Sequence, residues 1–411
     1  MAVAADRPRR RSVAGTLGAF GAALLAFPHP AARPGGPGEV CPYCKNDPKL
    51  LAPAGLVSHG PFPFGTTTSE EASKQIGYAK IYWLESAHHR IGSILGAYLI
   101  PDKETKRIRK ELKELESFLP AIDSRTRTLD PWLRVHLYAR RAEKFYASFL
   151  DLLGLKEGSF PDGKSKFNPG AGEKYMGEGP YLGEKDKYDL YLAETLPQFQ
   201  DFLMKYFGLG TRKPQRWNVI RRDAMFFGLW AKMDALISDT AVHCCLVHNL
   251  GHNYLDGFKH YSYDLPVWLT EGFGHWAQRA VDPAFVNYDN IEGSAPFRQN
   301  GEGWPAETRR IIQRGRAAPL ADLTRKNSFA ELDQNDHIVI WSKVDFLISS
   351  DRAKFAALLD RLKGRVDEQG YYLSKGLPDV QREAIRDLYG WTYGEFEEAW
   401  KAWVLANYAA Q

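Results

Sequence analysis

Two neighbouring stretches of the chain carry the pattern that decides its fold. The first reads His248-Asn249-Leu250-Gly251-His252, and the second reads Leu265-Pro266-Val267-Trp268-Leu269-Thr270-Glu271-Gly272-Phe273-Gly274-His275-Trp276. Four residues turn an α-helix through about 400°, so His248 and His252 lie on the same face of a helix. Gly257 and Pro266 allow that helix to end and a second helix to begin. We therefore expect Glu271 to approach the two imidazoles from an adjacent helix.

This combination of side chains is typical of a zinc site. Two imidazoles and a carboxylate that leave one position open are the arrangement with which a catalytic zinc holds and acidifies water. The sequence therefore predicts His248, His252 and Glu271 as ligands of Zn²⁺. The alternative is a helix whose two histidines are satisfied by water or backbone near an unrelated acidic residue. Histidine pairs with this spacing are common, and the second stretch is what favours the zinc site.

The two stretches resemble the motifs of the gluzincin metallopeptidases, which include thermolysin-like and aminopeptidase-like members. The family pattern is H-E-x-x-H followed by a glutamate, and residues 265–276 look like its P-x-W-L-x-E-G helix. The resemblance covers roughly residues 225–405, and residues 338–347 are similar to the helix behind the metal in peptidase-like domains of exported bacterial proteins. It implies an α+β, mainly α fold with a small sheet, an active-site helix pair and a helical carboxy-terminal part. It also implies zinc-dependent peptide hydrolysis.

Asn249 departs from this family pattern. It occupies the position of the glutamate that takes a proton from zinc-bound water, and an amide cannot do so near neutral pH. Loss of a general acid-base lowers a rate by about 10²- to 10⁴-fold. We therefore predict a degenerate peptidase that keeps its metal site, and leave open whether it is an enzyme. One alternative is a module that binds a peptide or a cell-envelope component without cleaving it, and another is a purely structural role.

Further groups near the motif have a functional and an ordinary interpretation. His337 lies near the place where related domains hold a Tyr or His that polarises the substrate carbonyl. His275, one turn after Glu271, is an alternative ligand or a structural histidine. Asp256 is an acceptor for the second N–H of His252 or a solvated carboxylate. Residues 225–230 form either an edge strand that pairs with an extended peptide or a buried core strand.

The first 32 residues have the pattern of a signal peptide. Arginines at positions 7, 9, 10 and 11 precede an apolar run at 13–27, and small residues follow at 31 and 32. The run is short for a membrane span of about 20 residues. We expect export to the periplasm, the cell envelope or the extracellular space, by the general or the twin-arginine route, with no transmembrane span after signal removal. An uncleaved anchor or a disordered tail is the alternative.

Residues 33–68 are rich in Pro and Gly and are predicted to form an extended linker, with structure beginning near Ser69. The linker contains Cys41-Pro42-Tyr43-Cys44, half of a zinc-ribbon pattern with no second copy. In an oxidising compartment a local disulfide or a reactive pair is therefore favoured over a metal site. The states of this pair and of Cys244 and Cys245 stay open.

Three further segments follow the linker. Periodicity predicts a helical amino-terminal region at 69–157, in which Asp130-Pro131 begins a helix that Gly154 ends. A Gly- and Lys-rich surface loop at 158–187 then leads to the metallopeptidase-like domain at 188–411, with short strands at 188–193 and 216–220.

Charge and composition limit the partners. The chain has 54 Lys and Arg against 50 Asp and Glu, a net charge of +4 without a basic stripe, so a nucleic-acid partner is not expected. Hydrophobic residues make up 44% of the chain, enough for substantial cores. A peptide or protein is the expected substrate or ligand.

Overall fold

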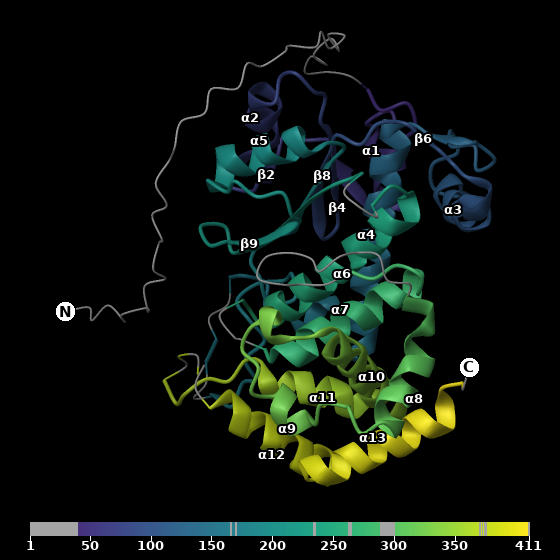
Figure 1. Cartoon of the computed structure of the whole chain (residues 1–411). Coiled ribbons are helices and arrows are strands. Elements are labelled where there is room, and N and C mark those ends of the chain that lie inside the picture. Colours follow the sequence, from purple (N-terminus) through teal and green to yellow (C-terminus); the bar gives the residue numbers. More distant parts are fainter. Residues whose placement is uncertain are drawn as a thin grey trace, which may run out of the picture.

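The computed structural model describes residues 40–409, except 165–166, 169–170, 233–235, 262–264, 288–300, 370, 372 and 374–375. The proposed signal peptide and the first part of the proposed linker lie outside these residues. Helices α6 (Asp239–Gly257) and α7 (Val267–Val281) pack against each other at the centre, between a sheet and the carboxy-terminal helices (Figure 1). Both helices of the motif are therefore present, as predicted.

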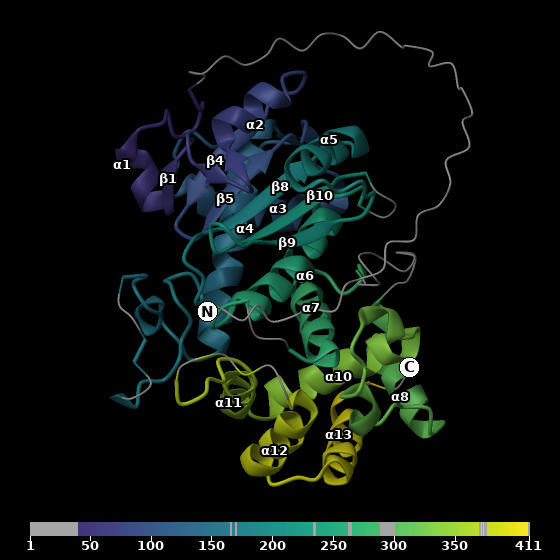
Figure 2. The same ribbon diagram turned by 90° about the vertical axis from the view of Figure 1, so that its left-hand side faces the viewer.

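A six-stranded sheet lies next to α6 (Figure 2), and its strands follow the order β1-β4-β5-β8-β10-β9. Its strands are β1 (Leu56–Ser58), β4 (Tyr82–Ser86), β5 (His89–Ser93), β8 (Tyr188–Ala193), β10 (Ala224–Trp230) and β9 (Gln215–Val219). The pairs β5–β8 and β8–β10 are parallel, and the other pairs are antiparallel. The strands predicted at 188–193, 216–220 and 225–230 are confirmed.

The linker prediction is wrong for the described residues 40–68. They form α1 (Pro48–Leu51), η1 (Ala52–Ala54), β1, β2 (Pro63–Phe64) and β3 (Thr67–Thr68). Phe62 and Phe64 are buried and place their rings against Trp83, and Phe64 also contacts Phe202. The prolines and glycines of this segment separate short elements whose aromatic side chains enter the core, so the composition that indicates a linker here makes turns.

The helical amino-terminal region at 69–157 is only partly helical. It contains α2 (Ser69–Gln75), α3 (Asp102–Glu116), α4 (Pro131–Leu152), β4, β5, β6 (Tyr98–Leu99) and β7 (Thr128–Leu129). Helix α4 agrees with the prediction, because the Asp130 side chain accepts hydrogen bonds from the first free backbone N–H groups. The prediction of helix from Ser69 to Ile100 is wrong at β4 and β5. These two strands are mostly buried, so their sequence lacks the alternation of apolar and polar residues that identifies a half-exposed strand.

The division between 69–157 and 188–411 is also not reflected in the fold, because β5 and β8 are neighbours in one sheet. Between them, η2 (Glu157–Ser159) begins a segment whose described residues before β8 contain little regular structure. The end of the segment predicted as a surface loop is buried at Leu182 and Glu184, where Gly183 lies against the backbone of Lys259. Strands from both sides of this segment therefore build a common scaffold beneath α6.

The remaining elements are helices, and all of them except α5 follow α7. They are α5 (Leu196–Phe207), η4 (Gly301–Gly303), α8 (Trp304–Gln313), α9 (Leu320–Leu323), η5 (Phe329–Glu331), α10 (Gln334–Ser350), α11 (Arg352–Leu362), α12 (Leu377–Tyr389) and α13 (Tyr393–Asn407). The predicted mainly α, α+β class is confirmed. Helix α10 packs directly behind α7, where Gly272 faces the backbone of Ile340. Among the described helices, none combines the length and apolarity that a membrane crossing requires.

A buried ion pair fastens α6 to α4. The Asp239 carboxylate, fully buried in the first turn of α6, accepts hydrogen bonds from Arg141 at 2.6 Å and from the Tyr138 hydroxyl at 3.0 Å. Arg107 of α3 approaches the same carboxylate at 3.3 Å. These contacts fix the beginning of the helix that carries the two histidines.

Candidate metal centre

The two histidines of α6 lie one turn apart on its buried face. Ser238 caps this helix by accepting a hydrogen bond from the N–H of Ala241, so the helix is regular before it reaches His248. The His248 and His252 side chains are completely buried, and their ring centroids are 4.9 Å apart. The two imidazoles therefore lie on the same face of the helix, as predicted.

Glu271 of α7 brings its carboxylate to these imidazoles. Its Oε2 lies 3.0 Å from His252 Nε2 and 3.6 Å from His248 Nε2. Ligands bound to one tetrahedral zinc at about 2.0–2.2 Å are about 3.4 Å apart. The donor atoms and their separations therefore fit a zinc ion held by these three side chains.

Gly274 provides the space in which the imidazoles lie. A Cβ atom at this position would be 2.8 Å from His252 Nε2 and 2.9 Å from His248 Cε1. Any larger residue would therefore push the rings away from Glu271. Gly251, on the facing side of α6, is different, because a Cβ there would meet Phe273 at an ordinary 3.5 Å.

The other oxygen of Glu271 faces a second pair of histidines. Oε1 lies 3.2 Å from His275 Nε2 and 3.1 Å from His337 Nδ1, and these two nitrogens are 2.9 Å apart. All three side chains are buried. The structure thus brings His275 and His337, from α7 and α10, to the same carboxylate as the predicted ligands.

Neighbouring contacts assign the proton on His275. The backbone N–H of Asn287 can only donate, so the Gln278 atom that it meets at 3.1 Å is the amide oxygen. The Gln278 amide nitrogen then donates to His275 Nδ1 at 3.0 Å. A ring whose Nδ1 accepts carries its proton on Nε2, the atom that faces Glu271. The Nε2–H of His275 thus faces both Glu271 Oε1 at 3.2 Å and His337 Nδ1 at 2.9 Å, which is the arrangement of a positioning residue rather than of a ligand.

The carboxylate of Glu271 is charged in this surrounding. Burial alone would raise the pKa of this carboxyl, but the imidazoles around it outweigh burial and hold the pKa well below its usual range. Burial lowers the pKa of His275 to about 3, against the opposing effect of Glu271. A charged carboxylate is the protonation state that a divalent cation requires of Glu271 as a ligand.

Asn249 points to the sheet side of α6 and has both ends of its amide engaged. Its Oδ1 accepts a hydrogen bond from Arg216 Nη1 at 2.7 Å, and its Nδ2 donates to the Cys245 carbonyl at 2.8 Å. Arg216 comes from β9, which has only β10 as a neighbour among the described strands. Neither group of the amide can accept a proton from water at neutral pH.

The remaining sequence predictions near the site have different outcomes. Strand β10 lies between β8 and β9, so the edge-strand alternative for residues 225–230 is wrong and the edge is β9. Asp256 is in contact with Lys363 through its backbone carbonyl, at 2.8 Å, and its suggested support of His252 stays a prediction. Arg216 was not identified from the sequence, because nothing in its spacing relates it to residues 248–252.

Comparisons with known proteins give no relative for this chain. No family model, no curated protein and no solved structure matches it.

Proposed function

We propose that this chain is an exported zinc-binding protein of the gluzincin kind, a degenerate peptidase that keeps the metal site and lacks the general base. The observation that carries the proposal is the approach of Glu271 Oε2 to the Nε2 atoms of His252 and His248, at 3.0 and 3.6 Å, from two adjacent helices. The order of the ligands along the chain and the α7 sequence support the resemblance to that family.

The ligands have distinct tasks in this proposal. His248 and His252 bind the ion through Nε2, and Glu271 binds it through Oε2. His275 and His337 hold the other oxygen of Glu271 and so fix the direction of the carboxylate. Zinc in such a site would supply Lewis acidity toward water or a carbonyl group. The role of His337 in polarising a substrate carbonyl stays a prediction, in which its Nδ1 lies against Glu271 and its other ring nitrogen would serve the substrate.

Asn249 is the reason to expect little or no hydrolysis. The amide cannot accept a proton, and the cation that it contacts, Arg216, cannot replace a base. Without general acid-base catalysis, hydrolysis by the remaining machinery is about 10²- to 10⁴-fold slower than in a complete site.

The second candidate function is peptide binding without cleavage, and the edge strand β9 favours it. An edge strand offers unpaired backbone groups to an extended peptide. Trp217 on β9 is 41% exposed and Ile220 just after it is 67% exposed, which gives this edge apolar side chains. Arg216 of the same strand reaches Asn249, so a peptide added to β9 would lie next to the metal centre.

Metal analysis of the purified chain tests the metal site. We expect zinc at the helix pair, and we expect the double variant His248→Ala/His252→Ala to contain one ion per chain less than the natural protein. An unchanged metal content in that variant contradicts the metal site.

Peptide hydrolysis then separates the enzyme from the binding module. Asn249→Glu should hydrolyse unstructured peptides at least about 10²-fold faster than the natural chain, while the matched variant Asn249→Gln, of equal length but without a base, stays inactive. Efficient, chelator-sensitive hydrolysis by the natural chain would instead show a complete enzyme with another base.

A further inference from the structure

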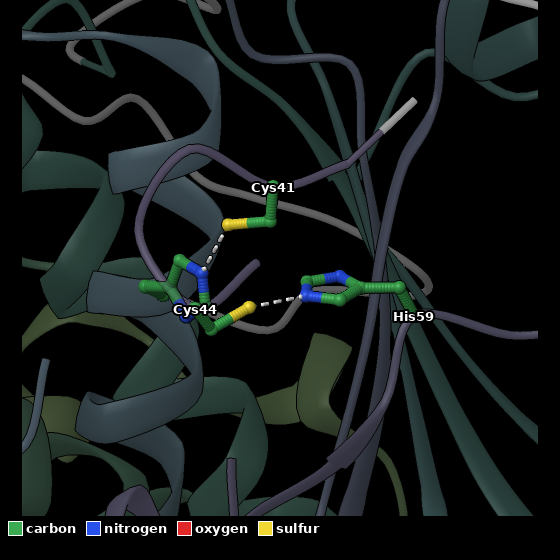
Figure 3. A group of neighbouring side chains, drawn as sticks. Cys41, Cys44 and His59 are labelled. Atoms are coloured by element: carbon green, nitrogen blue, oxygen red, sulfur yellow. Dashed lines mark hydrogen bonds between the residues drawn. The ribbon is translucent and has the colours of Figure 1, made fainter. Parts of the chain in front are cut away.

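Two cysteines near the start of the described chain lie beside two histidines from distant segments. Cys41 Sγ is 3.1 Å from Nε2 of His136, a residue of α4. Cys44 Sγ is 3.0 Å from Nε2 of His59, and Figure 3 shows both cysteine side chains beside His59. The four donor atoms all lie within 4.8 Å of one another. Each sulfur therefore faces a different imidazole, and the two thiols are not joined.

The backbone around the cysteines folds both sulfurs to one side. The Cys41 carbonyl accepts from Lys45 N–H at 2.9 Å, and the Cys41 N–H donates to the Asn46 side chain at 3.2 Å. Lys45 and Asn46 both have left-handed backbone angles, with φ of 54° and 55°. Two such residues in succession are sterically unfavourable unless the surroundings require the turn.

His59 is held as metal-bound imidazoles usually are, and His136 is fixed by burial. His59 Nδ1 lies 2.7 Å from the Trp83 carbonyl oxygen, which can only accept, so Nδ1 carries the proton and the Nε2 lone pair faces Cys44. His136 is 1% exposed and is fixed in the second turn of α4. The hydroxyl of Tyr43, between the cysteines, donates to Asp130, the cap of α4, and so holds the turn against the helix.

We propose that Cys41, Cys44, His59 and His136 bind one structural zinc ion. Two thiolates at about 2.3 Å and two imidazole nitrogens at about 2.0–2.1 Å form a closed tetrahedral site, which leaves no position for substrate. In that geometry a sulfur and a nitrogen are about 3.6 Å apart, so the side chains need to separate by only about half an ångström. Binding replaces the two thiol protons, which pass to solvent.

The ion would join three parts of the chain. The cysteine turn precedes α1, His59 directly follows β1 at the end of the sheet, and His136 belongs to α4. Strand β1 is only three residues long and pairs only with β4 among the described strands. A cross-link from this strand to α4 would stabilise an edge of the sheet that has few hydrogen bonds of its own. This site uses none of the residues of the helix-pair centre and is independent of the proposed function.

Cobalt substitution of the full chain tests the proposal, because only thiolate ligands give a near-ultraviolet charge-transfer band with Co²⁺. We expect the metal-depleted natural chain to develop this band fully with two equivalents of Co²⁺, one for each proposed centre. The band should fall by about half in Cys44→Ser, be lost in Cys41→Ser/Cys44→Ser, and be kept in Cys244→Ala, which changes a buried free thiol away from the site. It should also be kept in His248→Ala/His252→Ala. Absence of the band in the natural chain, or its persistence in Cys41→Ser/Cys44→Ser, overturns the proposal.

A second variant keeps the test valid if Cys44→Ser does not fold. His59→Cys retains four ligands and adds a third thiolate, so the charge-transfer band should increase by about half. A band of unchanged intensity in this variant contradicts His59 as a ligand. Mass analysis of the freshly purified natural chain after thiol alkylation without reductant provides a further check. A Cys41–Cys44 disulfide in that sample overturns the zinc site. Bound zinc together with Cys41 and Cys44 in the reduced thiol form supports it.

Discussion

The guanidinium group of Arg216, on the edge strand β9, donates a hydrogen bond to the side-chain oxygen of Asn249 at 2.7 Å. A glutamate introduced at position 249 would meet the same cation, and the resulting ion pair would hold the new base away from the metal. We therefore expect Asn249→Glu/Arg216→Gln to hydrolyse peptides faster than Asn249→Glu alone. An ion pair of about 1 kcal/mol corresponds to about a fivefold difference in rate.

Steady-state hydrolysis of one fluorogenic peptide by both variants measures this difference. Arg216→Gln in the natural background is the control and should stay inactive. A double variant slower than Asn249→Glu would mean that Arg216 assists the reaction.

Alanine substitutions of two glycines, Gly274 on α7 and Gly251 on α6, distinguish an effect on metal binding from an effect on helix packing. Gly274→Ala places a methyl group against both imidazoles, so we expect its zinc affinity at the helix pair to fall by about 10- to 100-fold. Gly251→Ala adds the same methyl group to the facing helix without a close contact and should bind zinc normally. It should also gain up to about 1 kcal/mol in the free energy of unfolding, because alanine favours a helix.

Competition with a zinc chelator gives both affinities, and chemical denaturation gives the stabilities. Equal zinc affinities of the two alanine variants would show that Gly274 does not face the ion.

Removal of His275 distinguishes a positioning histidine from a ligand of a second ion. If His275 only donates to Glu271, His275→Ala keeps the number of zinc ions per chain and weakens the helix-pair site by about 10- to 100-fold. His275→Gln, whose amide nitrogen can still donate, should recover part of the affinity. Native mass spectrometry counts the ions. Loss of one further ion in His275→Ala would indicate that Glu271 bridges two metals.

The buried pair of Asp239 and Arg141 gives the fold an acid-sensitive contact. Burial by itself would raise the pKa of Asp239, but the Arg141 charge outweighs it and leaves the pKa well below its usual range. A carboxyl with a lowered folded-state pKa contributes its full stabilisation above the unfolded pKa of about 3.9. That contribution is lost as the pH falls from about 4 through the folded-state pKa.

Denaturation midpoints measured between neutral and acidic pH test this contribution. Asp239→Asn should lower the free energy of unfolding by about 3–5 kcal/mol at neutral pH and weaken its decline in acid. Asp151→Asn is the control, because Asp151 forms an exposed pair with Arg352 and should change stability by less than about 1 kcal/mol. Equal effects of the two substitutions would show that the Asp239 contact does not stabilise the fold.

The sequence predicts the central helix pair well because its information is local. The spacing of His248 and His252 sets their common face, and Gly257 and Pro266 mark the turn between the helices. The approach of Glu271 then follows from the packing of two helices that are neighbours in the sequence. The hairpin of β4 and β5 could not be identified in this way, because strands buried on both faces have no alternating pattern.

The cysteine-histidine cluster depends on contacts between segments far apart in the sequence. His59 follows Cys44 at the spacing found between the second and third ligands of many zinc sites, and this signal could have been noticed. His136 lies 95 residues after Cys41, and only the folded sheet brings α4 to the cysteine turn. No local pattern marks it as a ligand.

The parallel pairing of β5 with β8 determines how this protein can be shortened. A chain that starts at Tyr188 would keep every predicted ligand of the helix pair but would lose the strand that covers β8. The uncovered backbone of β8 would then be a template for self-association. Work on the helix pair in isolation therefore requires residues from both halves of the polypeptide.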